Sequence, residues 1–125
     1  MKIYVGYDSR EDIAWQVCRH SLMRHAGRDL AVHPLRQETL RELGLYTRPV
    51  DTKASTEFSI SRFLTPYLAA HDGWSIFVDC DFLFTADVRA IAKEATIYGF
   101  PLVDNYRVQY AYFVDRNGPE SKAPW

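Results

Sequence analysis

The sequence has no concentration of basic residues and no apolar run long enough to cross a bilayer. Fifteen Lys and Arg stand against 16 Asp and Glu, which gives a net charge of −1. Nucleic acids and anionic membranes are bound by basic surfaces, so we expect neither as a partner. A transmembrane segment is not expected either, because it needs about 20 consecutive apolar residues.

Cysteine is also scarce, with Cys18 and Cys80 alone, at a spacing unlike that of zinc or redox motifs. Cys80 falls in an apolar segment where a small buried thiol fits, so no disulfide is expected. The opening residues, MKIYVGY, run directly into a strand pattern without the features of a signal peptide. These features favour a reducing, cytoplasmic location.

What the sequence does contain is enough apolar material for one core. The chain has 125 residues, of which 47% are hydrophobic and 14% aromatic. That length is typical of one domain, and it shows no internal repeats. We therefore expect a single α/β domain over residues 1–125.

Apolar runs and helix breakers alternate along the chain. Strands are expected at 2–7, 30–35 and 75–79, with further strand-like runs at 96–103 and 108–114. Helices are expected at 9–26, 37–43, 57–70 and from residue 86 or 87 to about 95, and residues 48–56 form a loop. This alternation predicts a mostly parallel sheet with helices on both faces.

Three of these elements carry more detailed expectations. Ser9 and Asp12 form a capping box for the first helix, whose apolar face holds Ile13, Val17, Cys18, Leu22 and Ala26. The helix at 57–70, capped by Ser55 or Thr56, should bend or restart at Pro66. The strand at 75–79 is the most apolar and is expected to be central.

Acidic residues follow two of the expected strands. Asp8 follows the first, and Asp79 and Asp81 follow the apolar run Ile76–Val78. Ligands bind beyond the carboxyl ends of parallel strands. Two converging carboxylates there repel each other unless a cation lies between them, and Mg²⁺ and Mn²⁺ prefer such oxygen ligands. The D-x-D pattern therefore predicts a metal site, although a solvated strand end gives the same pattern.

Three segments together resemble glycosyltransferase family 8 and its bacterial relatives. They are the strand and helix IYVGYDSREDIAWQVCRHSLMRHA, the helix FSISRFLTPYL, and FVDCDFLFTADV, and they span roughly residues 3–92. The resemblance implies the GT-A fold, a Rossmann-like domain that binds nucleotide-diphospho-sugars.

The same resemblance assigns roles to individual residues. Asp8 takes the position of the acidic residue that meets the nucleotide base, and Arg62 that of the arginine that reaches the nucleotide-sugar. Asp79 and Asp81 match the metal-binding pair, with Mn²⁺ or Mg²⁺ as the ion, and Asp87 matches the opener of the next helix. Tyr7 is a further candidate for the nucleotide pocket, lying against a uracil ring.

The sequence departs from the family in its length. Family members continue into a second half with the acceptor site and the signature H-x-x-G-x-x-K-P-W. This chain ends in NGPESKAPW, with a different spacing and with Asp115 where the His would stand. The expectation is a donor-binding half whose acceptor half is absent: a fragment, a truncated product or an inactive relative. A sheet without that half would expose apolar surface, which favours self-association.

The expected function is retaining sugar transfer from a nucleotide-diphospho-sugar, most simply a UDP-sugar, to a glycan, lipid or protein acceptor. Two other interpretations stay open. One is a non-catalytic nucleotide-sugar-binding module. The other is a Mg²⁺-dependent phosphatase similar to the haloacid dehalogenases, in which Asp79 would be the nucleophile.

Overall fold

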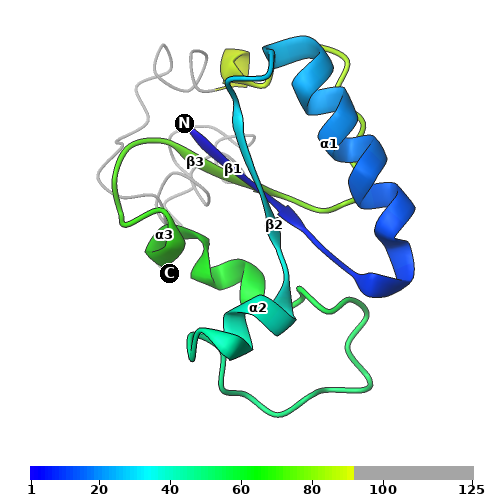
Figure 1. Ribbon diagram of the computed structural model, residues 1–125, viewed down its shortest axis with the longest axis vertical. Helices are drawn as coiled ribbons and strands as arrows, with labels where there is room; N and C mark the ends of the chain where they lie inside the picture. The colour runs from blue at the N-terminus through cyan, green and yellow to red at the C-terminus, as the bar shows by residue number, and fades with distance from the viewer. Residues whose placement is uncertain (92–125) are drawn as a thin grey trace, which may run out of the picture.

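The computed structural model describes residues 1–91, which form a three-stranded parallel sheet with helices on both faces. The strands are β1 (Lys2–Gly6), β2 (Ala31–Leu35) and β3 (Ser75–Val78), in the order β2-β1-β3 (Figure 1). Both pairings are parallel, with Lys2 opposite Ala31 and Ser75. This confirms the expected α/β class and the expected parallel sheet.

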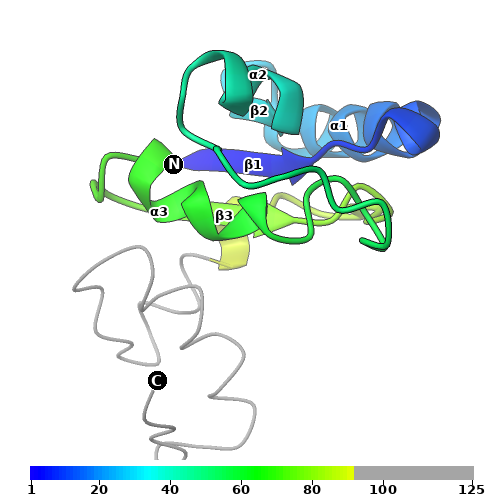
Figure 2. The ribbon, with the colours of Figure 1, turned by 90° about the horizontal axis from the view of Figure 1, so that it is seen from below.

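Alternate residues of β1 face two different apolar clusters. Ile3 and Val5 pack with α1 (Asp12–Ala26), and Tyr4 packs on the other face with residues from α2 (Gln37–Glu42) and the region of α3 (Thr65–Leu68). Figure 2 shows β1 between β2 and β3. β1, buried at four of its five positions, is thus the central strand of the described sheet.

The first helix differs from its prediction in its start and in its buried face. A 3₁₀ turn, η1 (Ser9–Glu11), precedes α1 and is capped by Asp8. The predicted capping box does not form, because Ser9 lies inside this turn and Glu11 precedes α1; the Ser9 hydroxyl donates to Glu57. Ile13 and Val17 are exposed, and the buried residues of α1 are Cys18, Ser21, Leu22 and Ala26. The helix ends before Gly27 at φ 87°, as predicted.

The helix predicted at 57–70 is replaced by short pieces. Residues 57–60 form turns, followed by the 3₁₀ helix η2 (Ser61–Leu64) and by α3, with Pro66 in its first turn. The Ser59 hydroxyl accepts from the Thr56 amide and holds the first turn. Pro66 has no N–H to continue a longer helix, so a new helix starts there.

The remaining predictions fall partly outside the described residues. β3 is paired on one side within residues 1–91 and so lies at the edge of the described sheet rather than at its centre. Residues 89–91 are helical, which fits the start of the last predicted helix. The rest of that helix, the runs at 96–103 and 108–114, and Asp115 lie outside the described residues. None of the helices described within residues 1–91 is long and apolar enough to cross a membrane.

Candidate functional site at the carboxyl edge of the sheet

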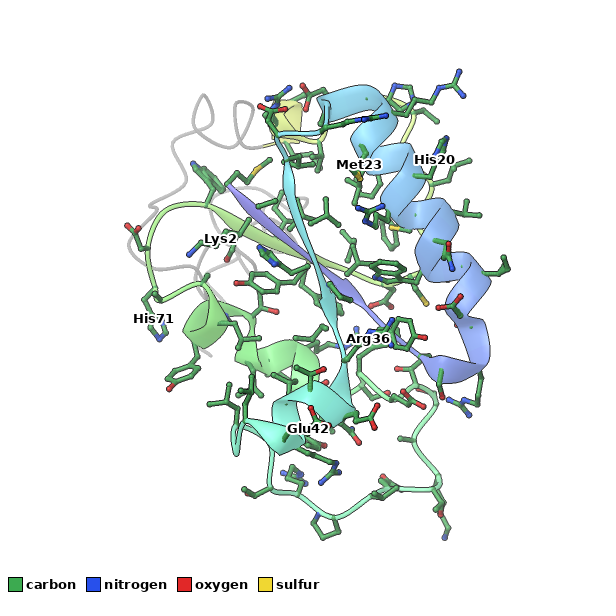
Figure 3. The ribbon with its side chains drawn as sticks, in the orientation of Figure 1. Lys2, His20, Met23, Arg36, Glu42 and His71 are labelled. Carbon is green, nitrogen blue, oxygen red and sulfur yellow. The ribbon has the colours of Figure 1, made fainter. Side chains whose placement is uncertain are left out.

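The parallel register brings the carboxyl ends of all three strands to one edge. Gly6 of β1 lies opposite Leu35 of β2, and Val5 lies opposite Val78 of β3. The segments that follow the strands therefore meet there, as parallel sheets require. Figure 3 shows Arg36, which follows β2, at this edge, and Lys2, which starts β1, toward the other end of the sheet.

Asp79 is the first residue after β3 and opens a tight turn. The Phe82 amide donates to the Asp79 carbonyl, with N···O 3.4 Å, so the D-x-D leaves the strand in this turn rather than as an extended continuation. The Asp79 carboxylate lies 3.2 Å from Nη1 of Arg62, and its side chain is 40% exposed. Burial raises the pKa of Asp79, Arg62 opposes that rise, and the nearby charge of Asp81 adds to it.

Cys80, between the two carboxylates, fixes the orientation of this turn. Its side chain is buried in the cluster shared with α1, and its Sγ lies 3.4 Å from Oε2 of Glu11. Burial raises the pKa of the Cys80 thiol to about 11, and Cys18 in the same cluster has its pKa raised by burial to about 12. Both cysteines are free, and they act as core residues rather than as nucleophiles.

The donors present at this turn fit a weakly held hard cation. Asp79 and Asp81 would supply carboxylate oxygens, and the charge of Asp81 is one cause of the raised pKa of Asp79. Within residues 1–91, no group of three or more His, Cys, Asp or Glu side chains is arranged to hold a metal. Magnesium is commonly bound by one or two carboxylates together with water and substrate phosphates, and two carboxylates satisfy that requirement.

Asp8 lies at the same edge, but its carboxylate is engaged within the protein. Oδ1 accepts from the backbone N and from Nε of Arg10, both at 2.9 Å, and Oδ2 accepts from Nη2 of Arg10 at 2.6 Å and from the Glu57 amide at 3.1 Å. The side chain is 1% exposed. Chiefly through the hydrogen bonds from Arg10, the pKa of Asp8 is held well below its usual range, although burial alone would raise it.

Tyr7 is also engaged with neighbouring side chains. The Arg36 guanidinium lies 3.5 Å from the centre of its ring, Trp15 contacts the ring edge-on at 6.0 Å, and its hydroxyl donates to Asp12 at 2.9 Å. The hydrogen bond to Asp12 raises the pKa of Tyr7. A base that stacked on the face covered by Arg36 would have to displace that guanidinium.

The structure brings Arg62 to Asp79, and it places Asp8 and Tyr7 in contacts with other side chains. A cavity of about 140 Å³ lies on the Asp8 side of the edge, lined by Arg10, Gln37, Tyr46 and the loop between residues 50 and 60. The roles of Asp8 and Tyr7 toward a nucleotide stay predictions.

Comparison with known proteins finds a relative that is much longer than this chain and is matched over part of its length. The chain is 50% identical over 90 residues to Protein CDI of Arabidopsis thaliana. The match covers 72% of this chain and 35% of that protein, so the chain spans about a third of the length of its relative. No family model matches the chain, and no solved structure matches it significantly.

Three residues of the site were missed by sequence reasoning. Arg10 binds both carboxylate oxygens of Asp8 with Nε and Nη2, and its signal was present as a basic residue two positions after the strand-end carboxylate. Phe58 and Phe77 lie side by side against the Arg62 guanidinium. Their sequence signal is that of ordinary core residues, and only the fold shows the second role.

Proposed function

We propose that this chain is the donor-binding α/β domain of a retaining glycosyltransferase with a GT-A fold, and that it binds a UDP-sugar through Mg²⁺ or Mn²⁺ at Asp79 and Asp81. The observation that carries the proposal is the contact between Arg62 and Asp79, 17 residues apart in sequence and 3.2 Å apart in space. A guanidinium beside a pair of carboxylates offers one group for phosphate and two for a cation.

The roles of the residues follow from their chemistry. Asp79 and Asp81 would hold the metal ion, and Arg62 would bind a diphosphate oxygen through its planar N–H groups. A bound divalent ion would supply charge neutralisation for the departing diphosphate. Asp8 and Tyr7 would border the nucleoside, Asp8 by fixing the segment around Glu57 that it already binds.

The proposal covers the donor side of the reaction. The chain spans about a third of the length of its Arabidopsis relative. Residues 1–91 do not specify which sugar or which acceptor is used.

Titration calorimetry of UDP into the 125-residue chain tests the donor site. We expect clear binding in Mn²⁺ and much weaker binding in EDTA. Asp81→Asn should remove most of the difference, because a neutral amide is a poorer ligand for a hard cation. Asp72→Asn, at an exposed acidic residue before β3, is the matched control and should behave as the wild type. Equal affinity in Mn²⁺ and in EDTA would contradict the proposal.

A pair of assays on the same preparation separates the reaction classes. Release of UDP from UDP-sugars supports the transferase, and release of phosphate from a general phosphatase substrate, abolished by Asp79→Asn, would replace it by the phosphatase. Binding of UDP without either activity would identify a nucleotide-sugar-binding module.

A further inference from the structure

Arg62 lies against two neighbouring aromatic rings from different parts of the chain. Its guanidinium carbon lies 5.3 Å from the ring centre of Phe58 and 5.2 Å from that of Phe77, and the two ring centres are 6.0 Å apart. Both distances are within the range of cation–π attraction. The guanidinium is therefore fixed by packing as well as by charge.

Both rings pack at the sheet. Phe77 lies on β3, two residues before Asp79, which follows the end of the strand. Phe58 is 1% exposed and lies directly against Gly6 of β1, where an added Cβ would come within 2.6 Å of the ring. The sheet thus determines where Arg62 sits relative to the D-x-D turn.

In this position Arg62 forms an ion pair with Asp79. Its Nη1 pairs with Oδ1 of Asp79, and 30% of the Arg62 side chain is exposed. The Nε atom is buried and has no hydrogen-bond partner in the described structure, so the outer nitrogen atoms carry the polar contact. A divalent ion and Arg62 would therefore compete for the same carboxylate.

We propose that Arg62, positioned by Phe58 and Phe77, is the resident cation of Asp79 in the ligand-free protein, and that it gives way to a divalent ion only when a diphosphate arrives to take the guanidinium. This inference rests on the proposed function and adds to it a coupling between metal and nucleotide. Metal alone binds weakly because Arg62 repels it and occupies Asp79. A diphosphate offers the guanidinium a better partner, which frees the carboxylate.

A purely structural ion pair would behave differently. Partly exposed pairs contribute little to stability, and removing one that has no role toward the diphosphate would leave the affinity for UDP in saturating Mn²⁺ unchanged. Competition instead predicts opposite effects of one substitution on two ligands: tighter binding of metal alone and weaker binding of nucleotide.

The test measures free Mn²⁺ by electron paramagnetic resonance in the 125-residue chain, first without and then with UDP. For Arg62→Gln we expect the affinity for Mn²⁺ alone to rise about three- to tenfold, because a nearby positive charge is removed. The affinity for UDP in saturating Mn²⁺ should fall on the order of tenfold, the usual effect of losing a charged hydrogen bond. The mutual enhancement of Mn²⁺ and UDP binding should shrink accordingly.

Three further variants keep the test specific. Arg62→Lys retains the charge and should leave Mn²⁺ affinity near that of the wild type. Phe77→Leu loosens the guanidinium and should shift both affinities in the direction of Arg62→Gln, by a smaller factor. Arg41→Gln removes a guanidinium that lies over Tyr46, 4.8 Å from its ring centre, and should change neither.

The outcomes separate the inference from the function on which it rests. If the wild type binds UDP with Mn²⁺ but Arg62→Gln does not bind Mn²⁺ more tightly, the competition is wrong and the donor site stands. If the wild type binds no Mn²⁺ even with UDP, both are overturned. Circular dichroism of each variant establishes that the fold is kept, and the Arg62→Lys and Phe77→Leu results decide the matter if Arg62→Gln is unfolded.

Discussion

At the scale of single residues, Asp8 has the most specific environment at the edge of the sheet. A carboxylate withdrawn from water is costly unless charged and polar donors replace the lost hydration. Arg10 and the Glu57 amide provide such donors. Asp8 therefore joins the end of β1 to the segment that leads into Phe58 and Arg62, which gives it a structural role next to its predicted role toward a nucleotide.

Replacing Asp8 by Asn should destabilise the protein at neutral pH. We expect the free energy of unfolding at pH 7 to fall by about 2 kcal/mol, because an amide cannot accept from Arg10 and Glu57 as a carboxylate does. The pKa of Asp8 is lowered in the folded state from its ordinary 3.8. The stability that the Asp8 carboxylate contributes is therefore present above about pH 4, and it is lost as the pH falls below that value.

Urea denaturation at pH 7 and at pH 3 measures both effects. The wild type should lose part of the Asp8 contribution between these pH values, and Asp8→Asn should show a smaller loss. Asp72→Asn should resemble the wild type at both. An Asp8→Asn variant as stable as the wild type at pH 7 would show that the carboxylate does not hold this segment.

The sequence singled out the D-x-D and Arg62 as candidate site residues, but not the residues that hold them in place. Asp79 and Arg62 have recognisable positions, at a strand end and in a segment that resembles a helix of glycosyltransferase family 8. Phe58 and Phe77 could not be distinguished from other core residues, because stacking on Arg62 depends on how η2 approaches β3 in space. The hydrogen bonds to the Asp8 carboxylate could not be predicted either, because one of the donors is the Glu57 backbone amide, 49 residues away in sequence.

At the scale of elements, apolar periodicity predicted where α1 lies but not which face it buries. Ile13 and Val17 continue the apolar stripe and are exposed, whereas the polar Ser21 is buried. Ser21 is satisfied locally, because its hydroxyl donates to the Cys18 carbonyl and accepts from the Phe84 amide. Hydrophobicity cannot predict such a residue, since its partner lies in a loop beyond β3.

The close packing of Gly6 against Phe58 links the central strand to the Arg62 segment. Gly6→Ala would place a Cβ about 2.6 Å from the Phe58 ring, and the ring would have to move. We expect the free energy of unfolding to fall by about 1–3 kcal/mol, the usual cost of overpacking.

A second substitution separates this contact from other effects of the added methyl group. Phe58→Leu removes part of the ring, so Gly6→Ala should cost less in that background than in the wild type, as expected for residues in contact. Urea denaturation of the two single variants and the double variant measures the coupling. Additive effects would mean that the new methyl group is accommodated without contact with the side chain at position 58.

At the scale of the whole molecule, residues 1–91 form a sheet whose carboxyl edge holds the D-x-D, Arg62 and Asp8. The α/β class and the parallel sheet were predictable because strands and helices alternate with clear breakers. The order of the strands was not, because the apolar content of 75–79 suggested a central strand while the described sheet has β1 at its centre. The apolar residues of a strand are buried by the helices on each face of the sheet as well as by neighbouring strands, so apolar content does not determine the strand order.

The 125-residue chain on its own is expected to bind donor but to transfer sugar slowly. The late His and Lys of the resembled family have no match at the same spacing in this sequence, and loss of one such electrostatic contact costs on the order of a hundredfold in rate. UDP release should be measured with Mn²⁺, a panel of UDP-sugars and candidate acceptors. Turnover of about one per second or faster, which is common for enzymes, would mean that the chain carries a complete site.

The most direct measurement for the central claim is the position of the metal itself. Substoichiometric Mn²⁺ added with UDP to ¹⁵N-labelled protein broadens the amide signals nearest the ion, and the effect falls steeply with distance. We predict that Asp81 and Phe82 lose intensity first, followed by Arg62, while Gly27 and Gly73, which lie toward the other end of the sheet, lose it last. Broadening that begins at Gly27 or Gly73, or that spares residues 79–82, would contradict a metal-dependent donor site at the D-x-D.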